Sequence, residues 1–331
     1  MASERAQLNL FRAIPRDMAL RDAQDLMAYP FFSLAKSRRV QPIAFAAGDV
    51  SIRVEAVPEH GMATIWDADI LIWAASHIVE ARDAGLKTSR LLSATPFEML
   101  KFMRRGTSGA AYARLKAALD RLQSTTIATS IGRPTGRRLH RFSWINEWVE
   151  QSDASGNALG IEMILPDWFY QLVLDQKLIL TIDPGYFDLT GGLERWLYRI
   201  VRKHGGRQSD GWRFNLRYLH LKSGSLAPYK WFSGEIRAIV KRQSLPGYWL
   251  AIEPAPRGGA ELSFRPACAK TVDSIVRSVT RNLVRSQSEP SCDHLPKKLK
   301  KRVRSETWRD LNFDSNESSN IAGRRARSTI S

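Results

Sequence analysis

Arginine and alanine side chains share one side of the segment 108–123 if that segment is a helix. The outer face would carry Ala110, Arg114, Ala117 and Arg121, and the opposite face Tyr112, Leu115, Leu119 and Leu122. Small side chains let a helix approach a partner closely, and guanidinium groups reach phosphate oxygens or guanine edges. The spacing therefore predicts a helix that binds a polyanion. The alternative is a solvated helix whose exposed alanines serve helix propensity alone.

Segment 228–243 has the same character. Its apolar face would hold Phe232, Ile236, Ile239 and Val240, and its opposite face Lys230, Gly234, Arg237, Ala238 and Lys241. A glycine inside a helix costs about 1 kcal/mol relative to alanine. Close approach to a partner's backbone would explain that cost, and so would an internal packing contact. Most of the tryptophans are expected in the core, but Trp231, near the start of this helix, has base stacking as an alternative.

Two basic turns follow these helices, at residues 132–138 and 254–259; the first holds three arginines and the second holds Arg257. Beside a DNA-binding helix, such a hairpin contacts the phosphate backbone or the minor groove. A solvated hairpin is the alternative for each turn. With the end of the preceding helix and the turn after it included, the candidate DNA-binding residues are Lys101, Arg104, Arg105, Thr107, Ser108, Ala110, Arg114, Ala117, Arg121, Arg133, Arg137, Arg138, Lys230, Ser233, Gly234, Arg237, Lys241 and Arg257.

The elements that must position these residues follow a definite order. A helix over 95–105, with Thr95 as its cap and Pro96 at its first position, precedes a tight turn and the helix over 108–123. Strands at 125–131 and 139–149 then enclose the first basic turn. Helix, turn, helix, strand, basic hairpin and strand is the order of a winged helix-turn-helix.

The second half repeats this order without repeating the residues. Helices are expected over 189–203, 215–222 and 228–243, and strands over 247–253 and 260–264. We therefore predict an α+β protein of two tandem winged helix-turn-helix domains with a basic, largely disordered C-terminal tail. The predicted parts are an N-terminal winged-helix domain with its leading segment at 1–150, a C-terminal winged-helix domain at 151–266, and a helical and disordered tail at 267–331.

Charge is concentrated in blocks along the 331 residues, whose formal net charge is +17. Residues 100–150 hold 10 basic and 3 acidic side chains, and residues 195–265 hold 14 and 4. Between these blocks, residues 151–194 hold 1 basic and 7 acidic side chains. Two basic blocks separated by an acidic one indicate two anion-binding modules.

Composition excludes several classes of protein. A hydrophobic fraction of 44% excludes wholesale disorder, and no apolar run reaches the ~20 residues of a membrane helix. Two cysteines, Cys268 and Cys292, make no disulfide framework, and the N-terminus lacks the pattern of a signal peptide. A cytoplasmic protein without membrane contact is expected.

Motifs for catalysis are missing from the sequence. Gly-x-x-x-x-Gly-Lys-Ser/Thr, Gly-x-Gly-x-x-Gly and Gly-x-Ser-x-Gly do not occur, and the six histidines show no metal-binding spacing. We therefore predict no enzyme activity, no catalytic residue, no cofactor and no metal. A nucleic-acid enzyme is the alternative from another class, and an assay for nicking or ATP hydrolysis tests it.

Six stretches of the chain resemble the replication initiator protein A family of bacterial plasmids: residues 28–36, 60–73, 115–126, 142–148, 165–170 and 187–198. The similarity covers about residues 8–265. It implies a plasmid-encoded initiator with tandem winged-helix domains that binds double-stranded origin DNA without catalysis of its own. It also implies host replication proteins as partners, for which we name the host initiator and the replicative helicase, and self-association is a further hypothesis. The lysine-rich tail departs from the matched part.

The resulting hypothesis is a plasmid replication initiator that binds origin DNA sequence-specifically through both winged helices. A transcriptional repressor, acting also on its own promoter, is the alternative, because both classes bind DNA alike. Deleting the gene from a minimal plasmid separates them. Loss of plasmid maintenance supports initiation, and raised promoter output alone supports repression.

Overall fold

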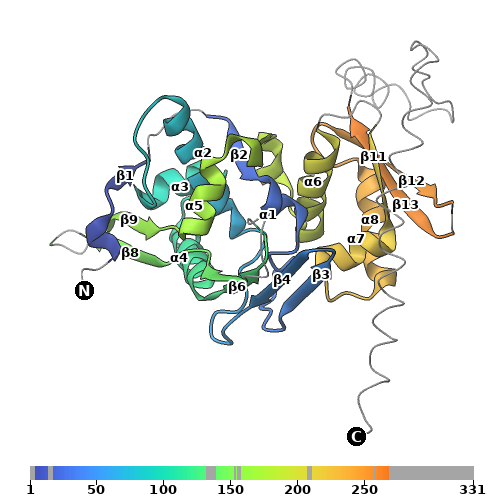
Figure 1. Cartoon of the computed structure of the whole chain (residues 1–331), viewed down its shortest axis with the longest axis horizontal. Helices are drawn as coiled ribbons and strands as arrows, with labels where there is room; N and C mark the ends of the chain where they lie inside the picture. The colour runs from blue at the N-terminus through green and yellow to red at the C-terminus, as the bar shows by residue number, and fades with distance from the viewer. Residues whose placement is uncertain are drawn as a thin grey trace, which may run out of the picture. The chain divides into compact units, whose positions relative to one another are not determined.

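A computed structural model describes residues 4–13, 18–131, 139–152, 154, 158–206, 211–256 and 258–267. These residues belong to one compact unit, Met1–Ala269, in which helices and sheets are mixed, as the α+β prediction requires (Figure 1). The predicted tail lies outside the described residues from residue 268 onward.

The N-terminal module, as we define it, combines three helices with a four-stranded sheet. The helices are α2 (Ala68–Asp83), α3 (Pro96–Phe102) and α4 (Gly109–Ser124). The strands are β1 (Leu10–Arg12), β5 (Leu91–Ala94), β8 (Glu147–Ser152) and β9 (Ala158–Ile164), in the sheet order β1-β5-β9-β8. β1 runs parallel to β5, and the other two pairs are antiparallel.

Local sequence explains where helix α3 of this module begins. Thr95 and Glu98 form a capping box at the start of α3, in which the Thr95 side chain accepts from the Glu98 amide at 3.2 Å. The Glu98 carboxylate accepts from the Thr95 amide at 2.9 Å in return. Pro96 occupies the first helical position, as expected. This start places the turn at 103–108 and α4 after it.

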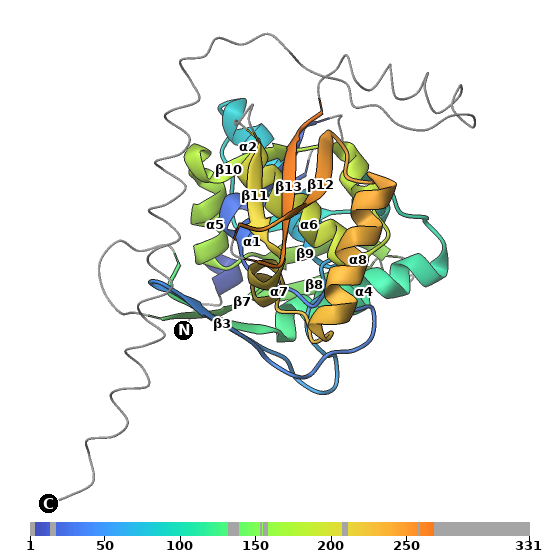
Figure 2. The same cartoon turned by 90° about the vertical axis from the view of Figure 1, so that its right-hand side faces the viewer.

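The C-terminal module repeats the order of elements of the N-terminal one. Its elements are α6 (Gly192–Gly205), β11 (Trp212–Asn215), α7 (Leu216–Ser223), α8 (Tyr229–Arg242), β12 (Tyr248–Pro254) and β13 (Ala260–Pro266). Its sheet order is β11-β13-β12, shown beside α8 in Figure 2. In each module the strand before the helix pair joins the last strand, which in turn pairs with the strand after the helix pair.

A second four-stranded sheet corrects the predicted first hairpin. Its strands are β3 (Ile43–Ala47), β4 (Val50–Glu55), β6 (Thr126–Thr129) and β7 (His140–Ser143), in the order β3-β4-β6-β7. β6 and β7 do pair antiparallel, but β6 also pairs with β4. The single strand expected over 139–149 is therefore two strands, β7 and β8, in two different sheets. The break contains Trp144 and Ile145, which are both fully buried.

Short elements connect the modules. β2 (Leu20–Ala23) pairs antiparallel with β10 (Ile179–Ile182), and α1 (Gln24–Ala28) packs on α6. The remaining elements are α5 (Asp167–Leu174) and the 3₁₀ turns η1 (Glu4–Gln7), η2 (Gln176–Leu178) and η3 (Pro184–Asp188). The predicted domain boundary after residue 150 falls inside β8, so the N-terminal module ends later, at Ile164. The division into two domains stays a prediction.

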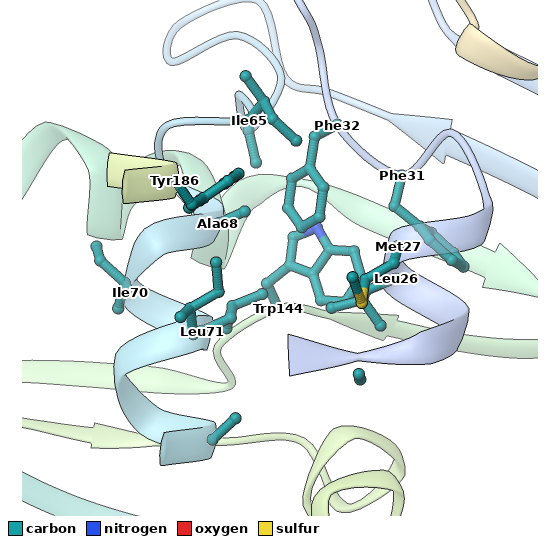
Figure 3. Packing of buried hydrophobic residues seen from close by; sticks show 14 of the residues in the cluster. Leu26, Met27, Phe31, Phe32, Ile65, Ala68, Ile70, Leu71, Trp144 and Tyr186 are labelled. Carbon is teal, nitrogen blue, oxygen red and sulfur yellow. The ribbon is translucent and has the colours of Figure 1, made fainter. Parts of the chain in front are cut away.

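A single cluster of buried apolar residues extends through both modules. Near its centre the ring of Trp144 stacks on Phe32 at 4.8 Å and meets Phe31 edge-on at 5.5 Å (Figure 3). Phe31 and Phe32 precede the helices of the N-terminal module in sequence, so the leading segment is part of the core. This core holds the helices of both modules on one framework.

Candidate nucleic-acid interface

Helix α4 buries the apolar stripe that the sequence predicted. Leu115, Leu119 and Leu122 are at most 1% exposed, and Tyr112 is half-buried beside them. On the other side Ala110 and Arg114 are exposed, and Ala117 is half-buried. This side of α4 is therefore a surface of small side chains with one exposed arginine.

Two of the predicted contacts in this module are engaged by buried carboxylates. Arg121 donates two hydrogen bonds of 2.8 Å to Asp67, whose side chain is 3% exposed. The hydrogen bond to Asp67 raises the pKa of Arg121, although burial opposes it. Arg105 donates to the fully buried Asp69 at 2.7 Å. Because both guanidinium groups already satisfy buried acids, we remove Arg105 and Arg121 from the proposed contacts.

The sequence pattern placed Arg121 on the outer face of α4, because the pattern of a single helix contains no information about the neighbouring helices. In the structure the C-terminal part of α4 lies against the start of α2, where Asp67 and Asp69 are found. Asp67 is the N-cap residue of α2 but makes no side-chain cap there, and both Asp67 and Asp69 accept from arginines instead.

The other predicted residues of this module are exposed or lie outside the description. Lys101, Arg104, Thr107 and Ser108 are exposed, and Arg104 pairs with the exposed Asp188 at 2.8 Å. Arg133, Arg137 and Arg138 lie outside the described residues. Their turn joins β6 to β7, so the hairpin that corresponds to β12–β13 in this module is β8–β9.

Helix α8 presents the basic face that its sequence predicted. Phe232, Ile236 and Ile239 are at most 1% exposed and pack inward. The opposite side exposes Lys230, Gly234, Arg237, Ala238 and Lys241, with Ser233 half-buried at its margin. Within the described part of the chain, no carboxylate pairs with Lys230, Arg237 or Lys241. The face is therefore cationic and uncompensated.

Gly234 has no internal packing role. A Cβ atom built on it meets no atom within 4 Å, so the glycine is not needed to make room for another part of the described chain. Of the two explanations given for this glycine, an internal packing contact is therefore excluded, and close approach to a partner's backbone is left.

The hairpin that follows α8 turns tightly. Gly258 and Gly259 take φ values of +86° and +90°, which side chains other than glycine rarely adopt. Arg257, the predicted contact in this turn, lies outside the described residues.

Helices α4 and α8 lie apart along the horizontal axis of Figure 1 but on the same side of the compact unit in Figure 2.

Comparison with known proteins identifies the family. Residues 21–250 match the family described as Replication initiator protein A. The chain belongs to this family. A protein of Wigglesworthia glossinidia brevipalpis, whose name assigns it provisionally to replication, is 32% identical over 226 residues, which are 67% of this chain and 81% of its own. The resemblance seen in the sequence is confirmed.

Two solved structures share the fold of this initiator-family chain. The crystal structure of selenomethionine derivatives of RctB domains 2 and 3 matches this chain with a TM-score of 0.53 and 16% sequence identity. The match covers 71% of this chain and 94% of the RctB chain. A second structure of RctB domains 2 and 3 matches with a TM-score of 0.50 and 15% identity, over 77% and 100%. At these identities the likeness shows the fold alone.

The replication initiator protein A chain joins its two modules through buried ion pairs that the sequence did not reveal. Asp69, at the start of α2, accepts from Arg105 and also from Arg195 of α6 at 2.8 and 2.9 Å. Four residues further along α6, Arg199 donates to Asp22 of β2 at 2.8 Å. The side chains of both α6 pairs are at most 5% exposed. These contacts attach α6 to the N-terminal half.

Buried cations also reduce the charge available for binding. Arg195, Arg199 and Lys222 all count toward the second basic block, yet each is at most 6% exposed. Burial lowers the pKa of Lys222 to about 8, with Lys203 contributing. The surface charge of this block therefore comes from residues such as those of α8.

The described residues contain neither a metal-binding cluster nor a membrane-spanning helix. No group of three or more His, Cys, Asp or Glu side chains there could hold a metal ion. None of the described helices combines the length and apolarity needed to cross a bilayer. Trp231 of α8, for which the sequence offered base stacking as an alternative to a place in the core, is 72% exposed.

Proposed function

We propose that this chain is a plasmid replication initiator that binds double-stranded origin DNA sequence-specifically through two winged helices. In this proposal α4 and α8 each enter a major groove, and the hairpins β8–β9 and β12–β13 are the wings. Membership of the initiator family and the repeated order of elements support it. The observation that carries it is the exposed face of α8, where three cations without carboxylate partners surround small residues.

The proposed contacts combine two chemical roles. Arg114, Lys230, Arg237 and Lys241 reach phosphates or base edges, and Ala110, Ala117, Gly234 and Ala238 allow close approach. Lys101, Arg104, Thr107, Ser108 and Ser233 stay proposed contacts at the margins, as do Arg133, Arg137, Arg138 and Arg257 in the turns. We propose further that the protein acts without catalysis, recruits host replication proteins and functions in the cytoplasm. Purified protein should show no nicking and no ATP hydrolysis.

Replacing Arg237 by Ala tests the role of α8. Binding to the DNA that flanks the coding region should weaken by about 1–3 kcal/mol if Arg237 contacts a base edge. If it contacts a phosphate, binding to all sequences should weaken and the slope of log K against log salt should fall by about 1. The measurement is a titration at several salt concentrations.

The matched control for this experiment is Arg53→Ala. Arg53 is exposed on β4 and pairs with Glu55 at 2.6 Å, so its loss should leave the affinity near that of the natural protein. Unchanged binding of Arg237→Ala would count against DNA binding by the C-terminal module. Loss of plasmid maintenance on gene deletion, restored by the natural gene in trans, would separate initiation from repression.

A further inference from the structure

Trp231 has the most exposed side chain among the large hydrophobic residues of the described chain, at 72%. It is the third residue of α8, and its amide donates to the Pro228 carbonyl at 2.9 Å, so its backbone belongs to the first helical turn. A single exposed apolar side chain needs no explanation by itself. Its position on the basic helix of the proposed interface is what calls for one.

The residues around Trp231 define its position on the helix. Lys230, Gly234, Arg237 and Lys241 form one stripe along α8, and Trp231, Glu235, Ala238 and Arg242 form the next. Gly234 lies beside Trp231, with open space beyond its backbone. A large apolar ring therefore borders a flat region of helix on one side, and cations border it on the other.

The direction of helical side chains adds a second constraint. Side chains lean toward the N-terminus of their helix, so the indole covers the start of α8 and leaves the region of Gly234 open. When a helix lies in the major groove, its N-terminal residues contact base edges. The major-groove edge carries one apolar group, the C5-methyl of thymine. An apolar ring at the start of the helix matches that group, and the cations match the phosphates.

We propose that Trp231 contacts thymine C5-methyl groups in the major groove and gives the C-terminal module a preference for thymine at that position. This inference rests on the proposed function, because it requires α8 to bind duplex DNA. Stacking on a base would require that base to leave the helix, which costs a few kcal/mol, whereas the methyl contact requires no opening of the duplex. The charge of the neighbouring stripe favours nucleic acid over a protein as the partner.

The test removes only the methyl groups. The DNA flanking the coding region is amplified once with thymidine and once with deoxyuridine triphosphate, and both fragments are titrated with the full chain. The natural protein should bind the uracil fragment about fourfold more weakly for each methyl that the indole covers. Trp231→Ala should bind both fragments equally, and Trp231→Leu, which keeps an apolar side chain, should retain part of the preference.

Leu86→Ala is the matched control, because Leu86 is 50% exposed after α2 and far from α8 in sequence. It should show the same preference for thymine as the natural protein. Equal binding of both fragments by the natural protein, or a preference that survives in Trp231→Ala, would overturn this inference and leave DNA binding intact. Failure of the natural protein to bind either fragment above unrelated DNA would instead overturn the proposed function.

Discussion

Gly234 is the residue at which helix stability and the proposed function diverge. Within a helix glycine is destabilising, and here no neighbouring atom of the described chain requires it. A residue that costs stability without an internal reason is expected where a partner approaches closely. On α8 that partner is DNA in our proposal, since the flanking side chains are Lys230 and Arg237.

Gly234→Ala should therefore change stability and binding in opposite directions. The free energy of unfolding should rise by about 0.5–1 kcal/mol, because alanine favours the helix and its methyl group meets open space. Affinity for the flanking DNA should fall. Urea denaturation and a DNA titration measure the two effects.

Gly192→Ala is the contrasting change at a helical glycine. A Cβ there would overlap the carbonyl oxygen of Leu34, so this variant should lose stability. If Gly234→Ala bound DNA as tightly as the natural protein, close approach at Gly234 would be refuted.

At the scale of the element, α4 shows how one helix divides its cations between structure and surface. Arg114 is exposed, whereas Arg121, seven residues later, is held by Asp67. Both residues project from the side of α4 that the sequence pattern predicted to be the outer one. The neighbouring helix α2 decides their roles, because its N-cap residue Asp67 supplies the buried carboxylate.

Replacing each arginine by Ala should separate these roles. Arg121→Ala should lower the free energy of unfolding by about 3 kcal/mol, because it leaves Asp67 buried without its cation. Arg114→Ala should change stability by less than about 0.5 kcal/mol but weaken DNA binding and lower its salt slope. Denaturant titrations and DNA titrations of both variants check this. Equal stabilities of the two variants would contradict the assignment of Arg121 to structure and Arg114 to the surface.

For the molecule as a whole, the buried ion pair between Asp69 and Arg195 matters most because it crosses between the two modules. Asp69 contacts Arg105, which follows α3, and Arg195, which belongs to α6. The apolar core also extends through both modules. We infer that α4 and α8 are held on one framework, so that the two proposed contacts with DNA depend on each other.

Asp69→Asn should destabilise the whole unit by about 3–5 kcal/mol, since it keeps the size of the side chain but leaves the buried Arg195 uncompensated. Asp188→Asn, which breaks the exposed pair with Arg104, should cost less than about 1 kcal/mol. Urea denaturation of both variants measures the contrast. Similar losses of unfolding free energy in the two variants would show that the buried ion pairs of Asp69 do not hold the modules together.

Much of the C-terminal module was predictable from the sequence. Helix α8, strands β12 and β13 and the inward face of Phe232, Ile236 and Ile239 follow from apolar periodicity, which local geometry controls. Glycines mark the turns between them. The family resemblance likewise needed only the order of residues along the chain.

Tertiary structure decided which strands share a sheet and which cations reach the surface. β6 and β7 look like a wing in sequence, but β6 pairs with β4, more than 70 residues earlier. The sequence suggested that Arg105 and Arg121 bind DNA, but they pair with Asp69 and Asp67. Two arginines of the second basic block, Arg195 and Arg199, pair with Asp69 and Asp22. Periodicity depends on neighbours three or four residues apart, whereas strand pairing and buried ion pairs join distant residues. Only the folded chain brings those residues together.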